Sequence, residues 1–134
     1  MKILRIGVDI DENKRIQKSI KNALFINPSL TYIKLASRLN ADCIEIHTGK
    51  LANLVKSKKN YLNELRRIKT SSKLAASLKL EVHAGHGLDY KTTKILTKIR
   101  EIEEFNIGHF IIGEAVFFGF SSVIKEFKKI IKNK

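Results

Sequence analysis

Cysteine is nearly absent from this chain, and long apolar runs are missing. A single cysteine, Cys43, occurs among 134 residues, so an internal disulfide is excluded and a reducing compartment is favoured. Cys43 lies in an apolar stretch and is predicted to be a small core residue. No run is long and apolar enough to span a membrane, and the residues after Met1 lack the apolar segment of a signal peptide. We therefore expect a cytoplasmic protein with no membrane partner.

Acidic residues are also few, with 13 Asp and Glu against 26 Lys and Arg, which leaves a net charge of +13. Such an excess attracts nucleic acid, anionic membranes or phosphorylated ligands. The lysines are spread through every predicted helix and do not form one stripe, which favours a basic solvated surface. Nucleic acid is therefore an unlikely partner. A basic nucleic-acid-binding domain remains the alternative, and it would bind with a steep dependence on salt.

Strand and helix patterns alternate along the chain, which is long enough for one domain with its own core. The apolar patterns predict strands at 3–10, 23–26, 42–46, 78–82 and 104–107. Helices are predicted at 12–21, 30–39 (with Ser29 as N-cap), from 62 to just before 78 or 80, at 89–100, at 110–118 (short and buried), and after Ser121 or Ser122 as cap. Residues 50–60 form a polar stretch with a few apolar anchors. This order predicts an α/β fold with a parallel sheet.

The histidines lie close to the ends of predicted strands. His47, His86 and His109 each stand beside a glycine just past a strand. Convergence of such loops on one face is the layout of a barrel active site. Gly108 and His109 open a helix, where free backbone N–H groups favour a phosphate. The pattern predicts a site for phosphorylated ligands with a histidine for proton transfer, although a glycine-rich turn with a capping histidine would give the same local sequence.

Three sequence blocks in this order and spacing resemble the pyridoxine 5'-phosphate synthase family. They are residues 43–49 (CIEIHTG), 84–88 (AGHGL) and 106–109 (NIGH) followed by 111–113 (IIG), and 25–28 and 115–117 also fit. The resemblance runs from about residue 23 to the C-terminus and implies a TIM barrel, of which this chain matches the last four βα units. We expect one partial TIM-barrel domain over 1–134, with 23–134 matching the family and 1–22 uncertain.

The resemblance also implies an activity and a set of site residues. The family condenses 1-deoxy-D-xylulose 5-phosphate with 3-amino-1-hydroxyacetone phosphate to give pyridoxine 5'-phosphate, phosphate and water. His86 is implied as the proton donor and Glu45 as the stabiliser of the transition state. Gly87 would contact the aminoketone phosphate, and Gly108 and His109 would hold its phosphate group. No cofactor and no metal are expected. A metal site from the histidines at 83, 86 and 109 is disfavoured because no carboxylate or cysteine stands at ligand spacing.

Several departures from the family are visible. A TIM barrel needs about 250 residues, and the three strands that carry the family's catalytic histidine and glutamate bases and a substrate-binding arginine have no counterpart here. Residues 7–11 (GVDID) resemble the family's first strand, which makes Asp9 and Asp11 possible substrate contacts; alternatively, 1–22 is the tail of a helix. Glu114 stands in place of an arginine and His83 in place of an asparagine.

Half a barrel would leave open sheet edges and an uncovered apolar face. We therefore expect a homo-oligomer or a partner that completes the barrel. The alternative is a truncated, non-catalytic remnant that keeps a phosphate-binding pocket.

Overall fold

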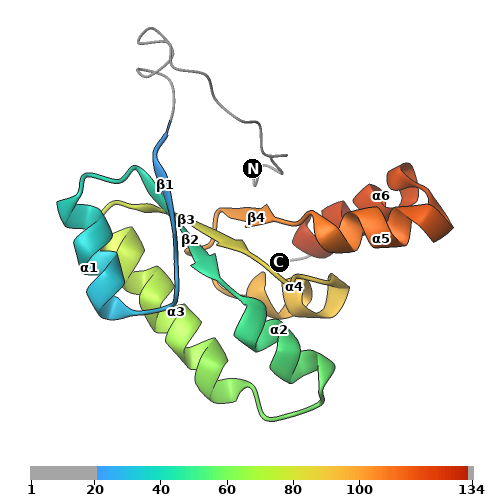
Figure 1. Cartoon of the computed structure of the whole chain (residues 1–134), viewed down its shortest axis with the longest axis horizontal. Coiled ribbons are helices and arrows are strands. Elements are labelled where there is room, and N and C mark those ends of the chain that lie inside the picture. Colours follow the sequence, from blue (N-terminus) through green and yellow to red (C-terminus); the bar gives the residue numbers. More distant parts are fainter. Residues whose placement is uncertain (1–20, 133–134) are drawn as a thin grey trace, which may run out of the picture.

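The computed structural model describes residues 21–132 as an α/β fold (Figure 1). Its four strands form one sheet in the order β1-β2-β3-β4, and each neighbouring pair is parallel. The elements are β1 (Ala23–Ile26), α1 (Leu30–Arg38), β2 (Cys43–His47), α2 (Gly49–Lys56), α3 (Leu62–Ser77), β3 (Glu81–Gly85), α4 (Tyr90–Leu96), β4 (Glu104–Asn106), α5 (His109–Phe118) and α6 (Phe120–Lys132). The predicted α/β class and parallel sheet are confirmed, and the arrangement is that of a partial barrel.

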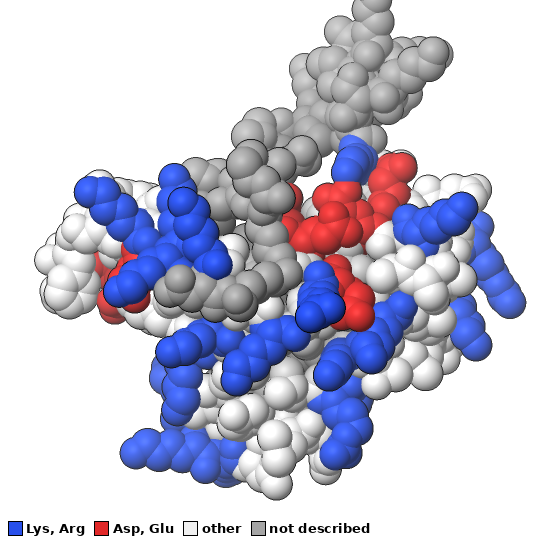
Figure 2. Space-filling view, turned by 180° about the vertical axis from the view of Figure 1, so that it is seen from behind, with Lys and Arg blue, Asp and Glu red and all other residues white. Residues whose placement is uncertain are grey.

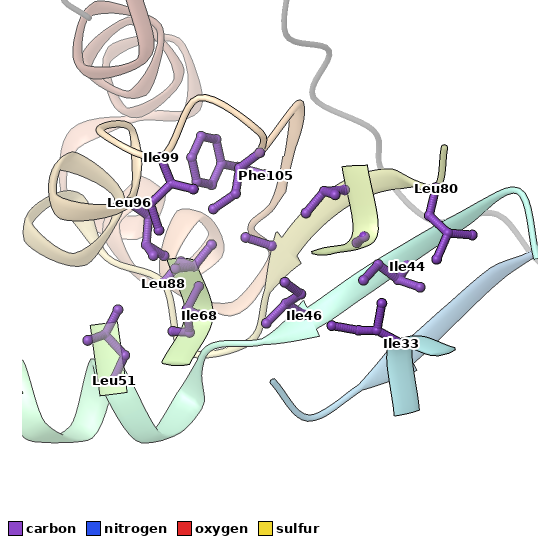
Figure 3. Close-up of a cluster of buried hydrophobic side chains, with 14 of the residues drawn as sticks. Ile33, Ile44, Ile46, Leu51, Ile68, Leu80, Leu88, Leu96, Ile99 and Phe105 are labelled. Atoms are coloured by element: carbon purple, nitrogen blue, oxygen red, sulfur yellow. The ribbon is translucent and has the colours of Figure 1, made fainter. Parts of the chain in front are cut away.

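One face of the sheet, here called the apolar face, packs against the helices. It presents Ile44, Ile46, Val82, Ala84 and Phe105, which belong to a single buried cluster. The same cluster takes in side chains from all four of the first helices, namely Ile33, Ala36, Leu51, Val55, Ile68, Ala75 and Leu96 (Figure 3). Alternation along each strand explains this face, because every second side chain of a strand points to the same side.

The other face of the sheet, here called the polar face, carries ionisable and amide side chains. Its residues are Cys43, Glu45, His47, Glu81, His83, Glu104 and Asn106, which are brought side by side by the parallel register. None of these residues belongs to the apolar cluster. In β2, β3 and β4 the expected uncovered apolar face is not seen, because apolar residues alternate with polar ones and point to the helices, whereas Phe25 of β1 is 55% exposed.

Helix α5 was expected to be short and buried; its position and short length are confirmed, and its burial is wrong. Ile111 is its one buried residue among those described, packed with Val123 and Phe127 of α6. Val116 and Phe117 are 79% and 80% exposed. Figure 1 shows α5 and α6 lying together at one side of the molecule. A continuous apolar run has no periodicity from which to read a buried side, so the sequence pattern could not reveal this exposure.

Several boundaries differ from the sequence patterns for local physical reasons. The stretch 50–60 contains the helix α2, and Leu51 and Val55 supply its buried side at a spacing of four residues. Residues 78–80 complete the C-terminal turn of α3, where Lys79 has φ 63°, so β3 begins only at Glu81.

The ends of three helices also differ. Helix α4 ends at Leu96, and α6 begins at Phe120, before either predicted serine cap. Ser29 occupies the N-cap of α1 but makes no side-chain capping hydrogen bond. The strand predicted at 3–10 and almost all of the helix at 12–21 lie outside the described residues.

The charged side chains are distributed unevenly over the surface. On the face shown in Figure 2, Lys and Arg side chains spread over most of the described surface, whereas Asp and Glu gather in smaller areas. This spread is the one expected from the sequence, and it offers no single basic stripe on that face. Within residues 21–132, no helix combines the length and apolar character that crossing a membrane requires.

Candidate functional site

The loop after β3 holds His86 in an unusual backbone conformation. His86 has φ 74° and Gly87 also has φ 74°, so two consecutive residues occupy the left-handed region. For a histidine this conformation is uncommon, and such residues are concentrated at functional sites. The side chain of Thr48 fastens the loop, since its hydroxyl lies 2.7 Å from the carbonyl oxygen of Gly85 and 2.9 Å from that of His86. Thr48 is fully buried, which makes these contacts part of the folded core.

His86 stacks on His47 at the end of the neighbouring strand. Their ring centroids lie 4.5 Å apart with an interplanar angle of 25°. Phe25, which pairs with Glu45 in the register of β1 with β2, has its ring centroid 5.2 Å from that of His47. Gly49 makes the stack possible, because a Cβ at that position would lie 2.7 Å from Cδ2 of His86 and 2.8 Å from Cε1 of His47. Residues 47–49 (HTG) therefore supply one ring of the stack, the hydroxyl that holds the His86 loop, and the space that the rings need.

Two crevices open beside His86. The first has a volume of about 610 Å³. It is bounded by α2, the His86 loop and the start of α5, with His86, Gly87, Asn106, Gly108, His109 and Lys56 among its lining residues. The second has a volume of about 410 Å³ and is lined by His47, Gly49, Lys50, Asn53, Leu54, Ser57, Lys59 and His86. Both crevices lie at the carboxyl ends of the strands, the usual location of ligand sites in parallel α/β folds.

The first crevice favours an anion at one end. Gly108 is the N-cap of α5 and His109 is its first residue, so unpaired N–H groups of the first turn face the loop region. The helix dipole adds partial positive charge there. Lys56, the last residue of α2, lines the same crevice. A phosphate group is the kind of ligand that this combination attracts.

Glu45 lies on the polar face just below His86. Asn106 donates a hydrogen bond from Nδ2 to Oε2 of Glu45 at 2.6 Å. Gly85 leaves the space that the carboxylate occupies, since a Cβ there would lie 1.8 Å from Oε1 of Glu45. Glu45 is therefore held under the loop by two neighbouring strands, and Asn106 connects it to the first crevice.

The structure brings most of the predicted site residues together. His86, Gly87, Gly108 and His109 line one crevice, and Glu45 reaches that crevice through its hydrogen bond with Asn106. The described residues include neither Asp9 nor Asp11, so these two lie outside the described part of the chain. His83 was expected near a strand end but lies in the middle of β3.

Some residues of the site escaped the sequence patterns. Thr48, Asn106 and Lys56 were given no role, although the first two stand inside the recognised blocks. Glu114, which stands in place of a family arginine, is not among the described residues that line either crevice. Its charge acts instead on Tyr90, whose pKa is raised by burial and then by Glu114.

A second group of ionisable side chains lies at the opposite end of the polar face. Nε2 of His83 is 3.1 Å from Oε1 of Glu81, and Nδ1 of His83 is 3.8 Å from Oε1 of Glu104. One ligand atom of each residue lies within 4.8 Å of the others, so these three could hold a metal ion. Lys21 also forms an ion pair with Glu81. The hydrogen bond from Lys21 is the main reason that the pKa of Glu81 is lowered.

The fold defines a class, the partial parallel α/β barrels, and the crevices form a candidate ligand site at the carboxyl ends of the strands. Residues 10–133 match the family model described as "Pyridoxal phosphate biosynthesis protein PdxJ". The chain belongs to this family.

Proteins named pyridoxine 5'-phosphate synthase are similar to this chain. The one from Pelagibacter ubique (strain HTCC1062) is 59% identical over 114 residues, which is 85% of this chain and 48% of the relative. Those from Zymomonas mobilis (46% identical, 88% of this chain, 45% of the relative) and a Sulfurihydrogenibium species (47%, 87% and 47%) are also similar. The chain thus spans about half the length of the curated relatives it matches.

Proposed function

We propose that this chain supplies one half of a pyridoxine 5'-phosphate synthase site, in which His86 donates the proton and α5 holds a substrate phosphate. The observation that carries the proposal is that His86 lines both crevices. A condensation of two phosphorylated substrates needs two adjoining binding spaces and a proton donor where they meet. The names of the relatives support this reaction class.

In this proposal the aminoketone phosphate, 3-amino-1-hydroxyacetone phosphate, binds in the first crevice. Its phosphate lies against the backbone of Gly108 and His109, and Gly87 leaves room for the substrate beside His86. 1-Deoxy-D-xylulose 5-phosphate then approaches from the second crevice, where Lys50 and Lys59 offer positive charge. Both substrates are thereby brought to the same imidazole.

Glu45 has the electrostatic role in this proposal. Condensation of an amine with a ketone passes through positively charged, iminium-like states, and a fixed carboxylate stabilises such charge. Asn106 orients the carboxylate and Gly85 makes room for it. Ring closure then needs proton transfers and loss of water and phosphate, for which the imidazole of His86 serves as donor.

The barrel is completed, in this proposal, by a second polypeptide that resembles the part of the relatives that this chain does not match. Apolar side chains remain exposed at both flanks, including Phe25 (55%) and Leu39 (64%) at the β1–α1 side and Phe117 (80%) in α5. The chain has a net charge of +13, so pairing with a second copy would bring like charges together, which is electrostatically unfavourable. A complementary half is therefore the favoured partner.

The test mixes this chain with a polypeptide comprising the unmatched part of the Pelagibacter ubique relative. Light scattering after size exclusion reports the complex, and release of phosphate with formation of pyridoxine 5'-phosphate reports turnover. We expect a one-to-one complex with turnover, and a loss of about 100-fold or more in kcat for His86→Asn. The matched control is Lys79→Asn, which replaces another residue of left-handed φ that lines neither crevice.

Three outcomes would contradict the proposal. A complex that binds inorganic phosphate without turnover would identify a non-catalytic remnant. An active homo-oligomer of this chain alone would overturn the complementary partner. Equal losses in His86→Asn and Lys79→Asn would show that the loop backbone, and not the imidazole, is what the reaction requires.

A further inference from the structure

We propose that Glu81, His83 and Glu104 form a binding site for a divalent transition-metal ion, at the end of the polar face opposite the crevices. The register pairs His83 with Glu104 across β3 and β4. Glu81 stands two residues before His83 on the same strand and therefore on the same face. The three side chains converge from two neighbouring strands, with their ligand atoms within 4.8 Å of one another.

Burial is the first reason to expect a cation here. Glu104 and His83 are each only 6% exposed. The ion pair between Oε1 of Glu104 and Nδ1 of His83 is 3.8 Å long. A buried carboxylate is costly unless it is paired and hydrogen-bonded. A metal ion between Glu104 and His83 would compensate this buried carboxylate more strongly than the 3.8 Å ion pair does.

The neighbouring groups leave this site available. Lys21 pairs with Oε2 of Glu81, whereas the oxygen that faces His83 is Oε1. Cys43 stands opposite Glu81 in the register with β2. Sγ of Cys43 lies 3.8 Å from the carbonyl oxygen of Asn22, to which it donates, and Cys43 is not among the three residues whose ligand atoms converge. The donors are thus one imidazole and two carboxylates.

This donor set selects a class of metal. Imidazole suits zinc, copper, iron and nickel, and carboxylate oxygen also binds zinc at about 2.0–2.2 Å. Three protein donors would leave further positions for water. Because the ion would join β3 to β4, its binding to the folded state would stabilise the fold. None of the three residues lines either crevice, so the site is separate from the one proposed for catalysis.

The experiment titrates the full chain with Zn²⁺ by calorimetry and with Co²⁺ by visible absorption. We expect one bound ion per chain, and affinity at least about tenfold weaker in His83→Asn and in Glu104→Gln. Lys21→Gln removes the cation that competes for Glu81 and should tighten binding. Circular dichroism verifies that each variant is folded, and Glu104→Gln carries the test if His83→Asn is not.

The matched control is the double variant His47→Asn/His86→Asn, which removes the stacked histidines at the other end of the sheet. Unchanged affinity in this variant supports the proposal. The proposal is overturned if wild type binds no ion at millimolar Zn²⁺. It is also overturned if affinity falls in the His47/His86 variant but not in His83→Asn or Glu104→Gln. A thiolate charge-transfer band with Co²⁺ that disappears in Cys43→Ser would overturn the donor set.

Discussion

Strand β2 shows how the two faces of the sheet divide stability from chemistry. Toward the helices it presents Ile44 and Ile46, both fully buried in the main cluster. Toward the polar face the alternate residues include Glu45, which accepts a hydrogen bond from Asn106, and His47, which stacks on His86. Adjacent residues of one strand therefore have unrelated tasks. A one-residue slip in register would turn each side chain to the opposite face of the sheet. The apolar pattern that folds the sheet therefore also orients the side chains of the candidate site.

The largest expected effect is a contrast between two neighbours on this strand. Ile46→Ala removes a fully buried side chain and should lower the free energy of unfolding by about 2–5 kcal/mol. Glu45→Gln keeps an oxygen that can accept from Asn106 and should change it by less than about 1.5 kcal/mol. Urea unfolding followed by circular dichroism measures both. If Glu45→Gln proves as destabilising as Ile46→Ala, the division of the sheet into a stabilising apolar face and a chemical polar face is contradicted.

Much of the fold could be predicted because its signals are local. Alternation and helical periodicity placed all four described strands to within a few residues, and glycines beside histidines indicated the loop at 85–87. The exposure of α5 could not be predicted, since burial depends on the layers packed outside an element. The same limit applies to the group around His83, of which only Glu81, two residues earlier, is close in the sequence. Glu104 reaches it only through the register of β3 with β4.

Candidate site residues divide in the same way. His86, Gly108 and His109 stand beside recognisable turns, whereas Thr48 acts through hydrogen bonds to carbonyl groups 37 and 38 residues away. Such a contact between distant parts of the chain leaves no periodic trace in the sequence. Asn106 is similar, because its partner Glu45 lies 61 residues earlier. The sequence therefore reveals site residues by their type and their position beside a turn, whereas their hydrogen-bond partners are identified only from the folded structure.

An effect of intermediate size on the free energy of unfolding is expected to distinguish two buried threonines, Thr48 and Thr93. The hydroxyl of Thr48 bonds to the carbonyls of Gly85 and His86, so Thr48→Val leaves acceptors without this donor and should cost about 1–3 kcal/mol of unfolding free energy. The hydroxyl of Thr93 in α4 is buried with no hydrogen-bond partner among the described residues. Thr93→Val is therefore expected to be neutral or stabilising. Urea midpoints at constant m-value measure the difference, and equal losses would mean that Thr48 does not anchor the His86 loop.

The smallest expected effect concerns Glu81 and pH. The hydrogen bond from Lys21 holds the pKa of Glu81 below its ordinary value of 4.5 in the folded chain. A carboxyl whose pKa is lowered by folding contributes stability that is fully present above its unfolded pKa and is lost as the pH falls through the folded pKa.

Wild type should therefore exceed Glu81→Gln in unfolding free energy at neutral pH, and the gap should close as the solution is acidified below about 4.5. Because Lys21 is half exposed, added salt should also narrow the gap. The measurement is urea unfolding of both proteins over a series of pH values, with Lys21→Gln as the partner variant. A gap that stays constant from neutral to acid pH would place the effect of Glu81 in packing, not in its charge.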